Sequence, residues 1–165
     1  MTRWSKYLLL TSLILLGLTV LWIASPIDQL TPLHRAVGRT HPLVVHMPVG
    51  GYLLWLCVLP FYRQVGNNYS LQRLCLYFVL ITSSIASVTG VLLLHEERYL
   101  HLDVTLHTVS SLMFNGILFL LCVLPGGTHW RKYLIWLSFV FITIATHYGT
   151  MMAHRDKTII DALTK

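Results

Sequence analysis

The chain has 165 residues, of which 55% are hydrophobic and only 11% are charged, with a formal net charge of +6. A soluble domain carries about a quarter charged residues, so this composition excludes an ordinary soluble domain and predicts one compact membrane unit. The basic residues form no stripe interleaved with aromatic residues, and no nucleic-acid partner is expected. We interpret the sequence as free of internal repeats.

Five apolar runs are long enough to cross a bilayer, which takes about 20 apolar residues for ~30 Å of hydrocarbon. In chain order, the predicted spans cover residues 7–24, 42–62, 71–94, 104–124 and 133–153. Short connections make consecutive helices antiparallel neighbours. We therefore predict an all-α membrane protein with five transmembrane helices. It would consist of a signal anchor (1–25), a periplasmic linker (26–41), an antiparallel four-helix bundle (42–154) and a periplasmic tail (155–165).

The first span begins like a secretory signal peptide, because Arg3 and Lys6 precede its apolar run. The run is ~17 residues, longer than a typical signal peptide, and Pro26 makes a cleavage site near Ala24 unfavourable. We expect an uncleaved anchor, with cleavage as the alternative. The basic flank places the N-terminus in the cytoplasm of a bacterium and the C-terminus in the periplasm, across the inner membrane. All six acidic residues then fall on the periplasmic side.

Histidines gather on that same side of the membrane. Eight of the nine are periplasmic in this orientation, namely His34, His41, His46, His95, His101, His107, His147 and His154. Ionisable side chains at membrane depth are costly and indicate a functional site by default. His46, His107 and His147 lie within predicted spans, and the first two are both ~6 Å below the start of their helices. The alternative is that each buried imidazole only donates to a backbone carbonyl of a neighbouring helix.

A b-type haem requires two axial histidines from opposed helices in an apolar slot. His46 and His107 lie on the second and fourth spans, which are diagonal in an up-down bundle, and we predict that they are the axial ligands. Small residues would clear the slot at Gly50, Gly90 and Gly149, although close helix packing explains them equally well. Haem propionates require cations at the water boundary, where the sequence places Arg39, Arg98 and Arg155.

Further candidate metal ligands are His41, His147 and His154, of which the last two are seven residues apart and share a helix face. Copper is the alternative cofactor, because thioethers stand near the imidazoles. The methionines concerned are Met47, Met113, Met151 and Met152. The three cysteines form no Cys-x-x-Cys-His motif, so no covalent c-type haem is expected. No catalytic residue is expected, since no carboxylate lies within a span and no His-Glu-x-x-His motif occurs.

The segment Gly-Arg-Thr-His-Pro-Leu-Val-Val-His-Met-Pro-Val-Gly at 38–50 resembles the opening motif of the DUF2231 family of bacterial membrane proteins, with Met47 in place of an aromatic residue. Residues 146–154 resemble the closing motif of that family. They keep His147, Gly149 and His154, but Thr150 replaces a second glycine. The resemblance implies a four-helix membrane module associated with c-type cytochromes.

Together these features predict a b-type haem electron-transfer subunit rather than a stand-alone enzyme. Its expected partners are the lipid bilayer and a periplasmic or membrane-bound cytochrome, or another membrane subunit. A structural or accessory subunit without a redox cofactor is the alternative.

Overall fold

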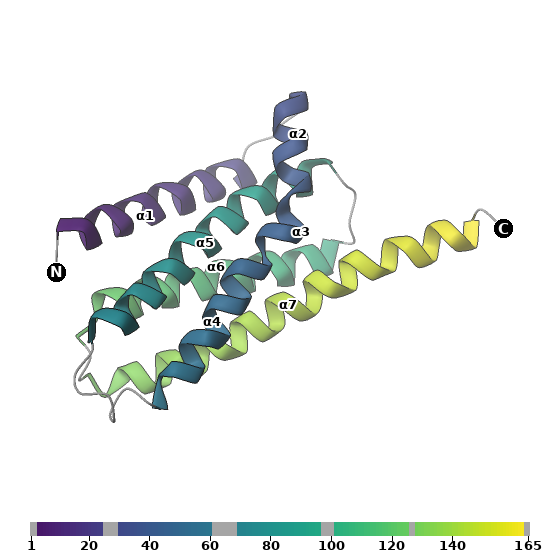
Figure 1. Cartoon of the computed structure of the whole chain (residues 1–165). Helices are drawn as coiled ribbons and strands as arrows, with labels where there is room; N and C mark the ends of the chain where they lie inside the picture. Colours follow the sequence, from purple (N-terminus) through teal and green to yellow (C-terminus); the bar gives the residue numbers. More distant parts are fainter. Residues whose placement is uncertain (1–2, 25–29, 61–68, 97–100, 126–127, 164–165) are drawn as a thin grey trace.

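The fold was taken from a computed structural model, which describes residues 3–24, 30–60, 69–96, 101–125 and 128–163. Every regular element in these ranges is a helix, as predicted. The helices are α1 (Arg3–Ala24), α2 (Pro32–Arg39), α3 (His41–Val44), α4 (His46–Val58), α5 (Tyr69–Glu96), α6 (His101–Val123) and α7 (Trp130–Leu163). Figure 1 shows the long helices lying side by side, with the two termini at opposite ends of the view.

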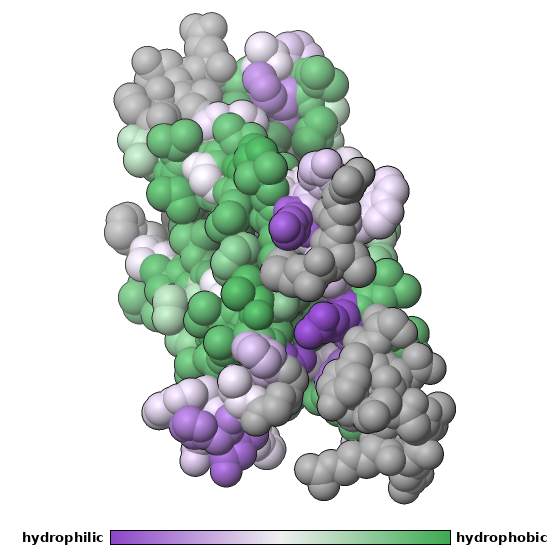
Figure 2. Space-filling view, turned by 90° about the vertical axis from the view of Figure 1, so that its left-hand side faces the viewer, coloured by the Kyte–Doolittle hydropathy of each residue, from purple (hydrophilic) through white to green (hydrophobic). Residues whose placement is uncertain are grey.

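The five predicted spans are confirmed, which identifies a multi-pass membrane protein. Helices long and apolar enough to cross a membrane cover Trp4–Ala24, Pro32–Val58, Leu71–His95, Leu102–Val123 and Trp130–Ala153. A helix satisfies its own backbone polar groups, which is a requirement in hydrocarbon. Figure 2 shows a broad apolar area on the face in view, with hydrophilic residues in smaller patches at its margins.

The second span is built differently from the prediction. Its helical course begins at Pro32 rather than at residue 42, so α2 occupies half of the predicted linker. The Thr31 side chain caps α2 by accepting a hydrogen bond from the backbone N–H of His34. The course is interrupted at Thr40 and again at Val45, which separates α3 from α4. Pro42 and Pro48 lack the N–H that would bond one turn back, and this favours both interruptions.

Helix α5 is at the centre of the fold, in contact with α1, α2, α3, α4 and α6, while α7 packs on α6. The core lies between these helices and includes the fully buried side chains of Tyr52, Trp55, Leu80 and Leu118. The Tyr52 hydroxyl lies 2.6 Å from Oγ of Ser138, which joins α4 to α7.

Helix α1 packs on α5 through a face of small polar residues. Ser5, Ser12 and Thr19 are buried and stand seven residues apart, on one side of the helix. The hydroxyls of Ser12 and Thr19 donate to carbonyls of their own helix, so small side chains satisfy themselves and let the two backbones approach. At the other end of the contact, Nε2 of His95 lies 3.1 Å from the carbonyl oxygen of Trp22.

Helix α7 is longer than a membrane crossing requires. Its 34 residues correspond to about 51 Å, against ~30 Å of hydrocarbon. The predicted tail is therefore helical as far as Leu163. Figure 1 shows that this end of α7 projects past the other helices.

Candidate functional site

A cavity of about 440 Å³ lies between α3, α4, α5, α6 and α7 at the histidine-bearing ends of these helices. Its volume is within the usual range for a small-molecule site, about 300–1,000 Å³. Apolar walls come from all the long helices around it, including Val49, Val91, Leu112 and Ile142. Hydroxyl and amide groups line another part of the wall, from Ser83, Ser87, Thr108, Ser111, Asn115 and Thr146.

His41 enters this cavity from the first turn of α3. Its Nδ1 lies 2.9 Å from the carbonyl oxygen of Ala86 and 3.2 Å from Oγ1 of Thr89, both on α5. A carbonyl oxygen can only accept, so Nδ1 carries the hydrogen and Nε2 presents a lone pair. A Cβ atom added at Gly90 would lie 2.9 Å from Cε1 of His41. The imidazole therefore occupies space that only a glycine leaves open.

His107 enters the cavity from α6 in the same manner. Its Nδ1 lies 2.7 Å from the carbonyl oxygen of Ala145 on α7, and a Cβ added at Gly149 would lie 3.1 Å from its Cε1. The rings of His41 and His107 are 6.2 Å apart between centroids, with their planes at 85°. Neither Nε2 has a hydrogen-bond partner within the described part of the chain. Two bare imidazole nitrogens from two helices therefore border one cavity.

His46 also borders the cavity, but it is not the residue that meets His107. Its side chain is exposed, and its Nδ1 lies 2.6 Å from the carbonyl oxygen of Pro42, one turn earlier. The structure thus pairs His107 with His41, where the sequence analysis paired it with His46. The two candidates are five residues apart and point in different directions, so an equal depth along the helix did not determine which ring faces α6.

Of the three glycines predicted to clear a slot, two lie at the site. Gly90 and Gly149 line the cavity and make room for the imidazole rings themselves. Gly50 is exposed, and a Cβ added there would have no neighbour within 4 Å.

The remaining predicted site residues are not among those that line the cavity in the described part of the chain. Arg39 is exposed at the end of α2. His147 is exposed on α7, with its ring centroid 5.3 Å from that of Tyr148. Arg98 lies outside the described residues, and so do the side chains of His154 and Arg155.

A copper site would require more ligands than the two imidazoles. No group of three or more His, Cys, Asp or Glu side chains within the described ranges is arranged to hold a metal ion. Of the four methionines considered, Met47, Met113 and Met151 are exposed, and Met152 alone lines the cavity.

Asn115 and two serines form a closed polar network on the cavity wall. Asn115 is 1% exposed. Its Oδ1 accepts from Oγ of Ser83 at 2.6 Å, and its Nδ2 donates to Oγ of Ser87 at 3.1 Å and to the carbonyl oxygen of Ser111 at 2.9 Å. The network joins α5 to α6, and all of its amide atoms are satisfied by the protein. This is the interhelical hydrogen bonding expected of isolated polar residues in membrane helices.

Comparisons with models of protein families, with curated proteins and with solved structures found no match. The site is therefore interpreted from its own geometry. The alternative given in the sequence analysis, a bond from a buried imidazole to a backbone carbonyl of a neighbouring helix, describes the Nδ1 contacts of both His41 and His107. What the sequence reasoning missed was that Ala86 and Ala145 supply these carbonyls. Each alanine stands four residues before a glycine that its imidazole partner covers, and this recurring pattern was the signal available in the sequence.

Proposed function

We propose that the protein is a membrane electron-transfer subunit that binds b-type haem between His41 and His107. The observation that carries this proposal is the pair of imidazoles from α3 and α6, with ring centroids 6.2 Å apart beside a cavity of about 440 Å³.

The donor set fits a haem iron. The porphyrin supplies four nitrogens, so two protein ligands are sufficient, and opposed helices are the usual source. His41 and His107 would supply those two ligands, and their ring centroids lie 6.2 Å apart. Hydrogen bonds from Nδ1 to the carbonyls of Ala86 and Ala145 fix the tautomer and the orientation of each ring, as outer-shell partners of metal ligands do.

Iron with two axial imidazoles has no open position, so the haem would supply one-electron transfer rather than oxygen chemistry. The cavity walls are mainly apolar, and the chain's own residues hold the ligand rings and leave Nε2 free. Copper is the second candidate cofactor. Its ligands would be the same two imidazoles and the thioether of Met152, which lines the cavity.

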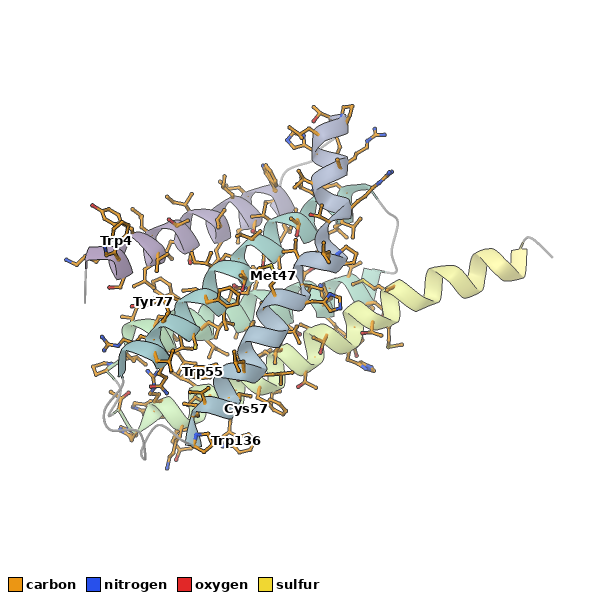
Figure 3. All side chains as sticks on the ribbon, in the orientation of Figure 1. Trp4, Met47, Trp55, Cys57, Tyr77 and Trp136 are labelled. Atoms are coloured by element: carbon orange, nitrogen blue, oxygen red, sulfur yellow. The ribbon has the colours of Figure 1, made fainter. Side chains whose placement is uncertain are left out.

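The placement in the membrane is part of the proposal. Helices α4–α7 would form an antiparallel four-helix bundle in a bacterial inner membrane, with α1 as an anchor and the N-terminus in the cytoplasm. Aromatic side chains are enriched where helices meet the membrane surface. Trp4 and Trp136 are 78% and 70% exposed, and Figure 3 shows both of them farther than Met47 from the C-terminal end of α7. The histidine-bearing end would then face the periplasm and a periplasmic or membrane-bound cytochrome, in line with the resemblance to the DUF2231 family.

Cysteine labelling tests the orientation. In a variant with Cys57, Cys75 and Cys122 replaced by alanine, Thr31→Cys should react with an impermeant maleimide added outside intact cells. The matched Lys132→Cys, exposed at the opposite ends of the helices, should react only after permeabilisation. The reverse pattern would overturn the periplasmic placement of the site.

A reduced-minus-oxidised spectrum of the full-length protein, made with an intact haem supply, tests the cofactor. Wild type should show the Soret and α-band changes of a six-coordinate b-type haem. His41→Ala and His107→Ala should lose them, while His46→Ala and His147→Ala should retain them. A wild-type protein that is folded and free of haem would refute haem binding and favour the accessory-subunit alternative. A spectrum lost in His46→Ala but kept in His41→Ala would refute the assigned ligand pair.

A further inference from the structure

The two imidazoles are held by the same arrangement of residues on two pairs of helices. His41 bonds the carbonyl of Ala86, four residues before Gly90, and His107 bonds the carbonyl of Ala145, four residues before Gly149. The Nδ1-to-oxygen distances are 2.9 and 2.7 Å, and the distances from an added glycine Cβ to Cε1 of the ring are 2.9 and 3.1 Å. The first pair consists of α3/α4 and α5, and the second of α6 and α7.

The sequences of these helix pairs also match. Residues 51–60 read Gly-Tyr-Leu-Leu-Trp-Leu-Cys-Val-Leu-Pro and residues 116–125 read Gly-Ile-Leu-Phe-Leu-Leu-Cys-Val-Leu-Pro, which are identical at seven of ten positions. On the second helices, Ile-Ala-Ser-Val-Thr-Gly at 85–90 corresponds to Ile-Ala-Thr-His-Tyr-Gly at 144–149. These matches favour an internal repeat, in contrast to the interpretation of the sequence as free of one.

The two histidines and the matching segments that begin at Gly51 and Gly116 are out of register by one residue, and the fold shows where the extra residue lies. His41 is ten positions before Gly51, whereas His107 is nine positions before Gly116. The first of these stretches contains the interruption at Val45 between α3 and α4, whereas α6 is continuous. The corresponding helices then end at equivalent positions, α4 at Val58 and α6 at Val123. An inserted residue absorbed at Val45 accounts for both observations.

We infer that residues 41–96 and 107–155 are two copies of one helical hairpin, and that the cavity holds its ligand on the pseudo-twofold axis between them. Such same-sense repeats are related by an axis along the membrane normal. The site takes a ligand that offers the same bonding atom on two opposite faces, as a planar metal macrocycle does. Gly90 and Gly149 are the positioning residues, since each sets how closely an imidazole approaches the neighbouring helix. The identity of the macrocycle as haem rests on the proposed function.

The two copies differ in the hydrogen bonds that their imidazoles make. Oγ1 of Thr89 lies 3.2 Å from Nδ1 of His41 and donates to the carbonyl of Ala86. Tyr148 occupies the equivalent position in the second copy, so His107 has the carbonyl of Ala145 as its only bonded partner among the described residues. A Thr89→Val variant should leave each imidazole with one backbone carbonyl as its hydrogen-bond partner.

Hemin titration of the full-length protein in detergent tests the twofold site. His41→Ala and His107→Ala should weaken binding to a similar extent. Gly90→Ala and Gly149→Ala should each weaken it about 10-fold or more, as loss of ligand positioning does, and should change the g-values of the ferric haem. Gly50→Ala, with no neighbour within 4 Å of the added methyl, should bind as wild type does. Hemin binding that depends on only one of the two imidazoles would overturn the twofold site and leave haem binding intact.

A ligand-free measurement separates the two proposals. In histidine-selective ¹⁵N NMR spectra of the full-length apoprotein, His41 and His107 should both appear as the tautomer with hydrogen on Nδ1. Gly90→Ala should shift only the His41 signals and Gly149→Ala only those of His107. If these shifts are seen and hemin does not bind, the repeat stands and the haem function fails. If the two histidines differ in tautomer, or do not respond to their glycines, the repeat-built site is refuted.

Discussion

Asn115 offers a measurable link between α5 and α6, because its side chain makes two hydrogen bonds to the neighbouring helix. Interhelical hydrogen bonds in membrane proteins average about 0.6 kcal/mol and reach at most about 1.7. The bonds to Ser83 and Ser87 should therefore contribute about 1 kcal/mol to the free energy of unfolding. The loss is limited because Oγ of Ser83 also donates to the carbonyl of Leu80, and Oγ of Ser87 to that of Ser83. Neither hydroxyl is left as an unsatisfied buried group, which would cost ~1–3 kcal/mol more.

The measurement is a double-mutant cycle on Asn115→Ala and Ser83→Ala, with reversible unfolding by SDS in mixed micelles. We expect a coupling energy of about 0.6–1.7 kcal/mol. Thr143→Ala is the control, since this exposed hydroxyl donates only within α7 and should change stability by less than about 0.5 kcal/mol. A coupling energy near zero, or one above about 3 kcal/mol, would contradict a network in which each group has its own helical acceptor.

Three other substitutions test how the helices are joined, each by the same unfolding assay. Tyr52→Phe removes the hydroxyl that joins α4 to α7 and should cost about 1 kcal/mol; no loss would mean that this contact is absent in the membrane. Arg131→Met removes the guanidinium that donates to the carbonyls of Leu121 and Leu124 at the end of α6. It should lower the free energy of unfolding by ~1.5–3 kcal/mol. The control Lys132→Met should lower it much less. Ser12→Leu places a large side chain in the fully buried contact between α1 and α5 and should cost ~1–3 kcal/mol; an effect no larger than that of the exposed Ile14→Leu would show that α1 does not pack there.

Hydropathy alone was sufficient to find the five membrane helices, because a spanning segment must be both long and apolar. Their ends were harder to predict. Arg35 and Arg39 lower the hydropathy of α2, so its helical turns were not included in the predicted second span. In α7, the apolar pattern stops near Ala153 although the helix continues to Leu163. In both places the backbone is helical although the side chains are no longer mainly apolar.

The pair of histidines was harder still to predict. The depth of a histidine follows from its position along one helix. The direction of its side chain depends on the rotation of that helix and on the neighbouring helices. His41 and His46 were both recognised as candidates, and only the interruption at Val45 and the packing on α5 decide between them. The inferred repeat is hard to recognise in the sequence for a related reason. A single inserted residue breaks the register between the two histidines and the matching segment that follows, and leucine-rich helices resemble one another in any register.

The hydrogen bonds from the two imidazoles also give the apoprotein a vibrational signature. In a helix, the carbonyls of Ala86 and Ala145 already accept from the backbone N–H four residues later, and each here accepts a further bond from a histidine. The carbonyl of Ala86 also accepts from Oγ1 of Thr89. A carbonyl with two donors vibrates at lower frequency than its neighbours, so isotope-edited infrared spectra of labelled alanine would single out these two groups. When its imidazole turns away, the Ala145 carbonyl would return to the ordinary helical frequency, and the Ala86 carbonyl would shift toward that frequency while keeping the bond from Thr89. Two oscillators in the backbone would thus report, without any cofactor, whether both rings are in place.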